Sequence, residues 1–366
     1  MNILLFLVVV FLPIFIMTIF IPYWTRKTES FGITIPEEIY FDDKLRKMRK
    51  QYAFTMSFFS ILITIVFIFI GISFTNDEQT LSILFAIATA AYLGISFAVY
   101  LKFHQNMKAL KAKENWNMSK SQQVFVDVRF RNQKLIYSNI WFILPIFIAA
   151  FLIFITFQAY QDIPEQIPMQ YNFEGEVTNW AEKSHRSVIL HPVMMVYLSL
   201  IFVLVNISIA KAKQQINPNN PKESIQKNII FRRRSSGFLL ITCFGLTLTF
   251  TLIQLSLIYP ISSSLITRLP LIIVVIIIGG AIILSVTTGQ GGSRLKNHSH
   301  ESTNITARDD DKYWKLGQFY FNKNDPALFL EKRFGIGWTV NLARPLAWII
   351  LLAVIGLAFG IPFLLT

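Results

Sequence analysis

Long apolar stretches alternate with charged connections along the whole chain. A helix needs roughly 20 apolar residues to cross about 30 Å of hydrocarbon. Eight stretches meet this requirement, and their interiors hold no Asp, Glu, Lys or Arg. They are residues 3–22, 52–74, 81–101, 137–159, 188–210, 237–258, 269–287 and 345–365. The pattern predicts an all-α, polytopic integral membrane protein with about eight transmembrane helices.

The basic residues are concentrated in alternate connections between these stretches. The first, third, fifth and seventh connections hold seven, eight, seven and nine Lys and Arg residues, which is 31 of the 34 in the chain. The other connections hold Lys183, Arg186 and Arg268. By the positive-inside rule the basic connections face the cytoplasm, so we expect both termini on the outer side. The first stretch has no basic segment before it and no small-residue cleavage site after it, which favours an uncleaved first helix.

The composition excludes the soluble classes of protein. Only 15% of the residues are charged, whereas soluble domains carry about 25%. A net charge of +13 would indicate nucleic-acid binding in a soluble chain. Here topology explains it, and we expect the bilayer and its cytoplasmic anionic headgroups as partners, with no nucleic acid. One cysteine, Cys243, rules out an internal disulfide and a multi-cysteine metal site.

Two of the basic connections carry local signals. In the first, Thr34 and Glu37 have capping-box spacing around Pro36, which predicts a juxtamembrane helix that continues into the second span. This helix is interpreted either as a docking surface or as a solvated element that fixes the topology. In the fifth connection, the three arginines at 232–234 directly precede a span and are expected to attract anionic lipid.

The last basic connection has two parts. Residues 288–311 are rich in Gly, Ser and Asn and predict a flexible linker, with the glycines of 289–292 as a flexible exit from a span. Residues 312–344 mix aromatic residues with Lys and Arg, and the Asp-Pro pair at 325–326 predicts a short helix over 327–333. An amphipathic element at the membrane interface is the favoured interpretation. Docking of a cytoplasmic regulator is the alternative.

Only one outward connection is long, and it joins the fourth and fifth stretches. Pro164 and Pro168 favour extended backbone before them, so we expect this loop to leave the membrane without forming a helix. Residues 172–175 offer turn chemistry. Its five acids against two bases leave the loop near −3, and it carries Trp180 among other aromatics. Two interpretations remain open: a recognition surface for a cationic peptide or polymer, and a small cap packed on the helix ends.

This loop resembles the uncharacterised domain shared with SdpI-type bacterial immunity proteins, over roughly residues 140–210. Gln170 stands where that family usually has His. Residues 312–345 resemble a second uncharacterised module, found with this domain in some Gram-positive bacteria. The resemblance implies a bacterial plasma-membrane protein that protects against a secreted peptide toxin or sequesters a repressor. It rests on Pro164, Ile167, Pro168, Asn172, Gly175 and Lys183.

These features assign roles to residues of the outer loop. We predict that the loop binds an extracellular peptide without turnover. The residues predicted to contact the ligand are Asn172, Glu174, Glu176, Trp180 and Lys183, and those predicted to shape the backbone are Pro164, Pro168 and Gly175.

Catalytic patterns such as HExxH, GxSxG and the phosphate-binding loop are absent from the sequence. We therefore predict a non-enzymatic binding, sensing or immunity protein with no catalytic residues, metal or cofactor. A transporter or channel-like protein is the alternative, although the spans lack the ionisable residues that usually mark ion paths. Thr247, Thr251 and Gln254 share one helix face, where they either line such a path or form interhelical hydrogen bonds.

Together these signals divide the chain into five segments. They are an N-terminal three-helix membrane region with a juxtamembrane helix (1–136), the SdpI-shared domain (137–210), two further membrane helices (211–287), a flexible cytoplasmic linker (288–311), and an aromatic module with the last span (312–366).

Overall fold

The computed structural model describes residues 2–74, 78–116, 121–123, 133–172, 175–217, 220–295, 305–307 and 309–365. In this part of the chain, eight helices are long and apolar enough to cross a membrane. They confirm the predicted fold class and number of spans. The candidate spans are Ile3–Trp24, Asp43–Phe74, Gln79–Glu114, Asn139–Gln158, Ser187–Lys211, Pro221–Leu255, Ser263–Gly292 and Pro345–Leu365.

The chain forms two compact units that are each discontinuous in sequence. The first unit combines Met1–Gln133, Ala212–Arg232 and Ile282–Arg344. The second unit combines Lys134–Lys211, Arg233–Ala281 and Pro345–Thr366. Two helices, α7 (Pro221–Leu255) and α8 (Ser263–Thr287), contribute residues to both units.

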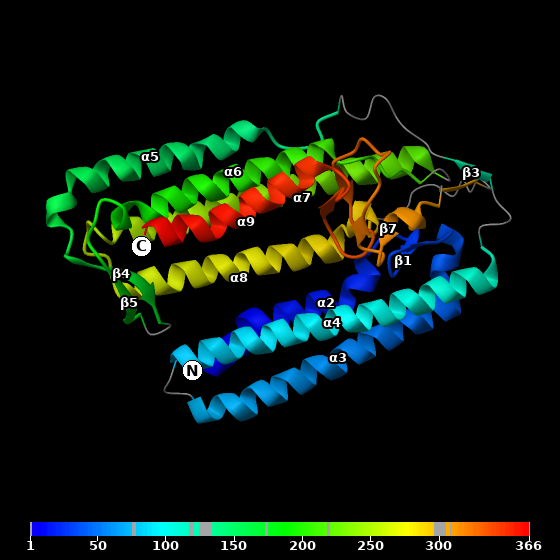
Figure 1. The fold of residues 1–366 in the computed structure, drawn as a ribbon, viewed down its shortest axis with the longest axis horizontal. Coiled ribbons are helices and arrows are strands. Elements are labelled where there is room, and N and C mark those ends of the chain that lie inside the picture. The colour runs from blue at the N-terminus through cyan, green and yellow to red at the C-terminus, as the bar shows by residue number, and fades with distance from the viewer. Residues whose placement is uncertain are drawn as a thin grey trace. The chain divides into compact units, whose positions relative to one another are not determined.

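Three spans of the first unit pack side by side (Figure 1). Their core is aromatic: the ring of Phe11 lies 5.2 Å from that of Phe67 and 4.9 Å from that of Phe85. The buried Tyr92 hydroxyl forms hydrogen bonds with Thr18 (2.6 Å) and Ser60 (2.9 Å), so no polar atom of this side chain is left unsatisfied in the apolar core. The spans are α1 (Asn2–Leu5) with a π-helical stretch (Phe6–Phe11) and α2 (Leu12–Trp24), then α3 (Asp43–Gly71) and α4 (Glu78–Glu114).

The connection between α2 and α3 differs from the predicted helix. A two-stranded hairpin, β1 (Glu29–Ser30) and β2 (Ile33–Thr34), is followed by a 3-10 turn, and the Thr34 hydroxyl donates to Asp311 instead of capping a helix. Asp42 is the N-cap of α3, because its Oδ1 accepts the Lys44 N–H at 2.7 Å. The capping prediction at Thr34 was therefore wrong.

Short antiparallel strands, and not a helix, form the last part of the first unit. Residues 327–333 contain strand β9 (Phe329–Glu331), so the helix predicted over this range is wrong. The extended backbone places Leu330 in a small buried core with Trp314 and Tyr320. The antiparallel pairs are β7 (Trp314–Lys315) with β8 (Phe319–Tyr320) and β9 (Phe329–Glu331) with β10 (Trp338–Val340). A separate parallel pair joins β3 (Ser121–Gln123) to β6 (Ile305–Ala307).

The glycines after α8 form a packed turn. Gly289 and Gly292 have φ of +65° and +80°, which glycine adopts without strain. Gln290 between them is fully buried: its amide donates to the Gly337 carbonyl at 3.0 Å and its Oε1 accepts the Gly337 N–H at 2.7 Å. The expected flexible exit at 289–292 is thus wrong, and residues 296–304 of the predicted linker lie outside the described part.

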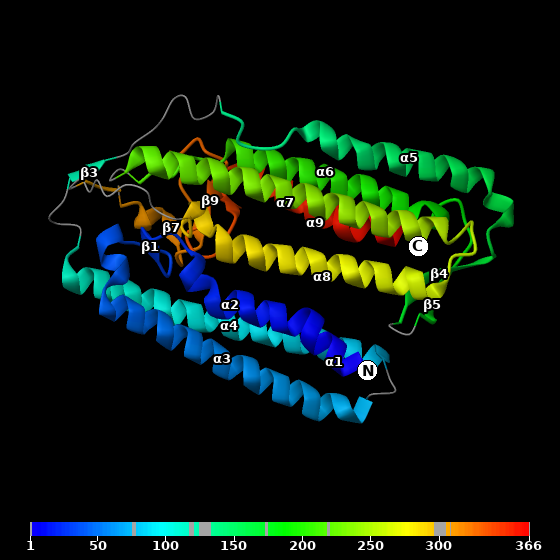
Figure 2. The same cartoon turned by 180° about the vertical axis from the view of Figure 1, so that it is seen from behind.

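In the second unit, α6 (Leu190–Lys211) lies between α5 (Ile143–Gln158) and α9 (Pro345–Leu365), as Figure 2 shows from behind. Polar side chains join α7 to its neighbours in this unit. The buried Gln254 amide donates to Thr156 Oγ1 at 2.8 Å and to the Val188 carbonyl at 2.9 Å. Interhelical hydrogen bonding therefore accounts for Gln254, the last residue of the polar stripe on α7.

Candidate functional site

The long connection of the second unit is a β-hairpin. Strand β4 (Gln166–Tyr171) pairs antiparallel with β5 (Val177–Glu182), and Pro168 lies opposite Trp180. Two register irregularities fall between Pro168 and Tyr171. Proline lacks an N–H to donate to the ladder, and such residues are confined to edges and bulges. The predicted extended, non-helical loop is therefore present.

The turn of the hairpin is fixed by one asparagine and one glycine. Asn172 accepts the Glu176 N–H through Oδ1 at 2.7 Å and donates from Nδ2 to the Glu176 carboxylate at 3.0 Å. Gly175 has φ of +88°, and a Cβ at this position would lie 3.3 Å from Thr267 Oγ1. The positions of Asn172 and Gly175 thus follow from turn chemistry. Glu174, a predicted ligand contact, lies outside the described residues.

Lys183 is turned inward at the base of the hairpin. Its side chain is only 8% exposed. The ammonium donates to the Ile163 carbonyl at 2.7 Å and lies 5.0 Å from the centre of the Tyr160 ring. These contacts fix the backbone at the first Ile-Pro pair, so Lys183 and Pro164 act together in positioning the loop.

An apolar cluster seats the hairpin on the helix ends of the same unit. Ile163 and Ile167 pack with Val188 and Leu257, and all four are buried. Burial of each such side chain contributes about 1.5–3 kcal/mol. The base of the hairpin is therefore packed on the helix ends, as the cap interpretation expects.

Strand β5 carries exposed side chains. Trp180 is 51% exposed, and Thr178 and Asn179 beside it are also exposed. The Glu165 carboxylate is 89% exposed, and Glu176 is exposed as well. The Lys183 ammonium lies 3.4 Å from the Glu165 carboxylate, so Glu165 is paired on one side and open to solvent on the other. The predicted residues thus lie at three places along one hairpin: Asn172 in the turn, Trp180 on the exposed side of β5, and Lys183 at the base.

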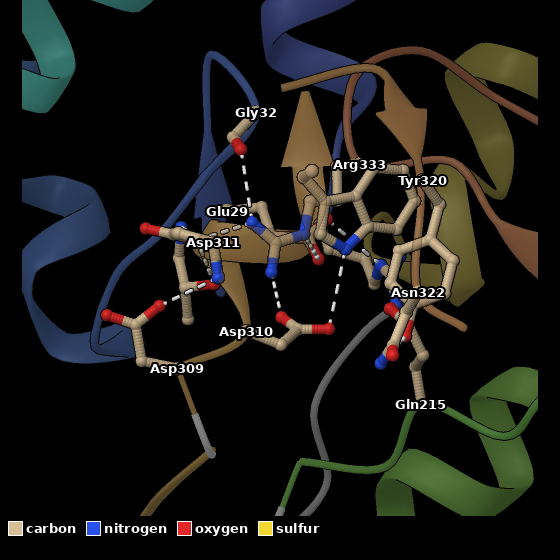
Figure 3. A network of polar contacts seen from close by, with 12 residues as sticks. Glu29, Gly32, Gln215, Asp309, Asp310, Asp311, Tyr320, Asn322 and Arg333 are labelled. Atoms are coloured by element: carbon tan, nitrogen blue, oxygen red, sulfur yellow. Dashed lines mark hydrogen bonds and ion pairs between the residues drawn. The ribbon is translucent and has the colours of Figure 1, made fainter. Parts of the chain in front are cut away.

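A second polar site, which sequence reasoning missed, lies in the first unit (Figure 3). Arg333 is 2% exposed, pairs with Asp310 and Asp311, and donates to the Gly32 carbonyl at 3.2 Å. Its guanidinium lies 5.0 Å from the centre of the Trp314 ring. Arg333 therefore cannot meet lipid headgroups, as an interfacial amphipathic element would require.

A neighbouring ion pair buries a second arginine. Arg232 and Glu331 are both fully buried and lie 3.1 Å apart, and Asn228 donates to the same Glu331 oxygen at 2.8 Å. The expectation that Arg232 attracts anionic lipid is wrong for this residue, whereas Arg233 and Arg234 are exposed. Arg26 extends the group, with its guanidinium 3.6 Å from Glu331 and 3.3 Å from Glu29.

We call these side chains the buried ionic cluster, after its buried arginines and glutamates; the three aspartates at its edge are partly exposed. Its members are Arg26, Glu29, Lys111, Arg232, Asp309, Asp310, Asp311, Glu331 and Arg333. Carboxylates outnumber cations by one in this set. The acid run before residue 312 and the basic pair at 332–333 are visible in the sequence, but each is equally typical of a solvated surface.

The cluster shifts the pKa values of its acids in opposite directions. Burial raises the pKa of Glu29 to about 7, although Arg26 and Arg333 oppose the shift. Burial would also raise the pKa of Asp311, but Arg333 and Lys111 outweigh it and hold that pKa at about 2. Asp311 is therefore a charged structural partner, while Glu29 titrates near neutral pH.

Among the described residues, no group of three or more His, Cys, Asp and Glu side chains is placed to hold a metal ion.

Comparisons with known proteins identify two segments of the chain. Residues 146–196 match a domain of unknown function, DUF1648, which covers α5, the hairpin and the start of α6. Residues 323–348 match a family of unknown function, DUF5808, which covers β9, β10 and the start of α9. No curated protein and no solved structure matches the chain. The chain is a multi-helix protein of membrane character that carries two domains of unknown function, in agreement with the resemblance to SdpI-like proteins.

Proposed function

We propose that this protein is a non-enzymatic, multi-pass receptor of the bacterial plasma membrane, which recognises an extracytoplasmic cationic peptide such as a secreted toxin. The β4–β5 hairpin is the recognition surface. The observation that carries the proposal is Trp180, a half-exposed indole on a strand whose base and turn are both fixed.

The hairpin chemistry supports a cationic, partly apolar ligand. A preformed aromatic face loses little conformational entropy on binding, and interface hot spots are enriched in Trp. The exposed Glu165 and Glu176 carboxylates would raise the association rate of a cationic peptide in a salt-dependent manner. An immunity role, as in SdpI-type proteins, follows if the captured peptide is a toxin.

The test compares two tryptophans of equal exposure. Trp180→Ala is expected to abolish protection of a deletion strain against a panel of secreted bacteriocins and cationic antimicrobials. Truncation of a buried Trp anchor costs about 2 kcal/mol or more, or roughly 30-fold in affinity. Trp141, which is 52% exposed and lies at the other end of α5, provides the control substitution Trp141→Ala.

Membrane abundance of both variants is measured alongside, so that loss of protein is distinguished from loss of binding. If Trp180→Ala combined with Glu174→Gln and Glu176→Gln still complements the deletion fully, the hairpin is only a cap. Protein-dependent solute flux in proteoliposomes would instead favour a transporter.

A further inference from the structure

An open pocket of about 360 Å³ lies in the first unit, where α2 ends and the chain leaves α8. Two cationic side chains line it, Lys27 and Arg294, together with polar and aromatic groups. Tyr23, Tyr40, Phe41 and Ser293 are among these lining residues.

The two cations of this pocket differ from those of the buried ionic cluster. The Lys27 ammonium lies 5.3 Å from the centre of the Phe41 ring, and Arg294 Nε donates to the Val286 carbonyl at 3.5 Å. Within the described ranges, neither cation has a carboxylate at ion-pair distance, whereas Arg232 and Arg333 are both paired. Among the described residues, no carboxylate neutralises the two positive charges of this pocket.

The remaining lining completes a site for a phosphate group. Tyr23, Tyr40 and Ser293 add hydroxyl-bearing side chains to the lining, and the Ser293 hydroxyl donates to the Trp24 carbonyl at 3.4 Å. Charge-assisted hydrogen bonds from Lys and Arg to phosphate are among the strongest in proteins. Tyr40 is buried, with the Arg49 guanidinium 4.1 Å from its ring centre and donating to its carbonyl. The floor of the pocket is thus preformed.

The walls of the pocket continue into apolar, exposed surface of two spans. Phe20 of α2 is 45% exposed, and its ring lies 6.3 Å from that of Tyr23. Val286 of α8, the acceptor for Arg294, is 44% exposed, and Ile283 one turn earlier is 64% exposed. In a membrane-spanning chain such surface contacts acyl chains, which places the pocket at headgroup level.

We propose that this pocket binds the phosphate of an anionic phospholipid, with Lys27 and Arg294 as the charged contacts and the acyl chains lying along α2 and α8. A net negative headgroup fits better than a zwitterionic one, because no described residue of the lining is an anion that could meet a choline or ethanolamine cation. The site stands apart from the hairpin and does not depend on the proposed recognition function.

The experiment measures lipid binding to the purified full chain in neutral detergent, by thermal unfolding and native mass spectrometry. Phosphatidylglycerol is expected to raise the unfolding midpoint and to remain bound, and phosphatidylcholine is not. Lys27→Gln with Arg294→Gln should weaken the apparent affinity for phosphatidylglycerol at least about tenfold, since each basic residue near the surface contributes roughly a fivefold effect.

The matched control removes the same charge elsewhere in the first unit. Lys47 and Lys108 are exposed and do not line the pocket. Lys47→Gln with Lys108→Gln should change the affinity by less than about threefold, because solvent and salt screen exposed charges outside the pocket. The charge-keeping pair Lys27→Arg with Arg294→Lys should retain binding. If both Gln pairs lose the same affinity for phosphatidylglycerol, only the net charge of the protein matters, and the proposed site is overturned.

A soluble arm distinguishes the source of the phosphate. Glycerol 1-phosphate, tested on the same protein, should compete weakly because it lacks acyl chains. Competition as strong as that of the lipid would overturn the lipid assignment in favour of a free phosphate ester. Equal binding of phosphatidylcholine and phosphatidylglycerol would overturn the charge argument.

Discussion

Glu29 is the carboxyl group that sets the charge balance of the buried ionic cluster. It lies 3.3 Å from Arg26 and 3.9 Å from Arg333, which also pairs with Asp310 and Asp311. With all acids ionised, the cluster carries one more carboxylate than it has cations. Protonation of Glu29 removes this excess, in agreement with the burial that raises its pKa to about 7.

The pKa of Glu29 predicts a pH dependence of stability. Its ordinary value is 4.5 and its folded value is about 7, so between these values the folded protein binds more protons than the unfolded chain. Stability from this group is fully present below the lower value and is lost as pH rises through the upper one. We expect the unfolding midpoint of the wild type to fall between about pH 5 and pH 8 more than that of Glu29→Gln.

The measurement is thermal unfolding of both proteins in the same neutral detergent across this range. The Gln variant is neutral at every pH, so the difference between the two curves isolates the titration of Glu29 from that of other groups. Parallel curves would show that the Glu29 carboxyl is ionised throughout, as an ordinary paired acid would be.

At the scale of elements, the hairpin turn depends on the positive φ of Gly175. An L-residue in the left-handed region costs about 1–2 kcal/mol, and here the added Cβ would also press on Thr267. We expect Gly175→Ala to increase amide hydrogen exchange in both strands of the hairpin. Gly279→Ala is the control, because Gly279 has no positive φ and a Cβ there meets nothing within 4 Å. Unchanged exchange in Gly175→Ala would mean that the turn does not hold the strands.

The elements also show which parts of the fold a single sequence can predict. The eight spans are dictated by local composition, and the extended loop by its prolines, so both were predicted correctly. The helix expected over residues 327–333 was wrong because Leu330 and Glu331 find their partners far away in sequence, at Trp314 and Arg232. Capping signals are local, and these long-range contacts override them.

In the predicted site, too, some features follow from the local sequence and others depend on contacts with residues farther along the chain. Pro168 and Gly175, which were predicted to shape the loop, lie at a register irregularity and at the turn of the hairpin. Asn172 was predicted to contact the ligand, and in the structure its side chain binds Glu176 within the turn. The inward position of Lys183 depends on the Ile163 carbonyl and the Tyr160 ring, which local pattern does not specify. Whether Trp180 contacts a ligand stays a prediction.

At the scale of the whole molecule, the partition of basic residues predicts the orientation in the membrane. The connections with 31 of the 34 Lys and Arg should face the cytoplasm, and the hairpin and both termini should face outward. Thr178 and Lys315 are exposed residues in an outer and an inner connection under this prediction. Cys243 is buried and is the only cysteine in the sequence, so Cys243→Ser provides a background without other thiols.

Single-cysteine variants Thr178→Cys and Lys315→Cys on this background test the orientation with a membrane-impermeant thiol reagent. In intact cells we expect labelling at 178 and protection at 315, and permeabilised cells should show labelling at both, because both side chains are exposed. Labelling at 315 in intact cells, or protection at 178 that persists after denaturation, would contradict the orientation. An inverted protein would place the acidic hairpin in the cytoplasm, where a secreted peptide cannot reach it, so this measurement also decides whether recognition by Trp180 is feasible.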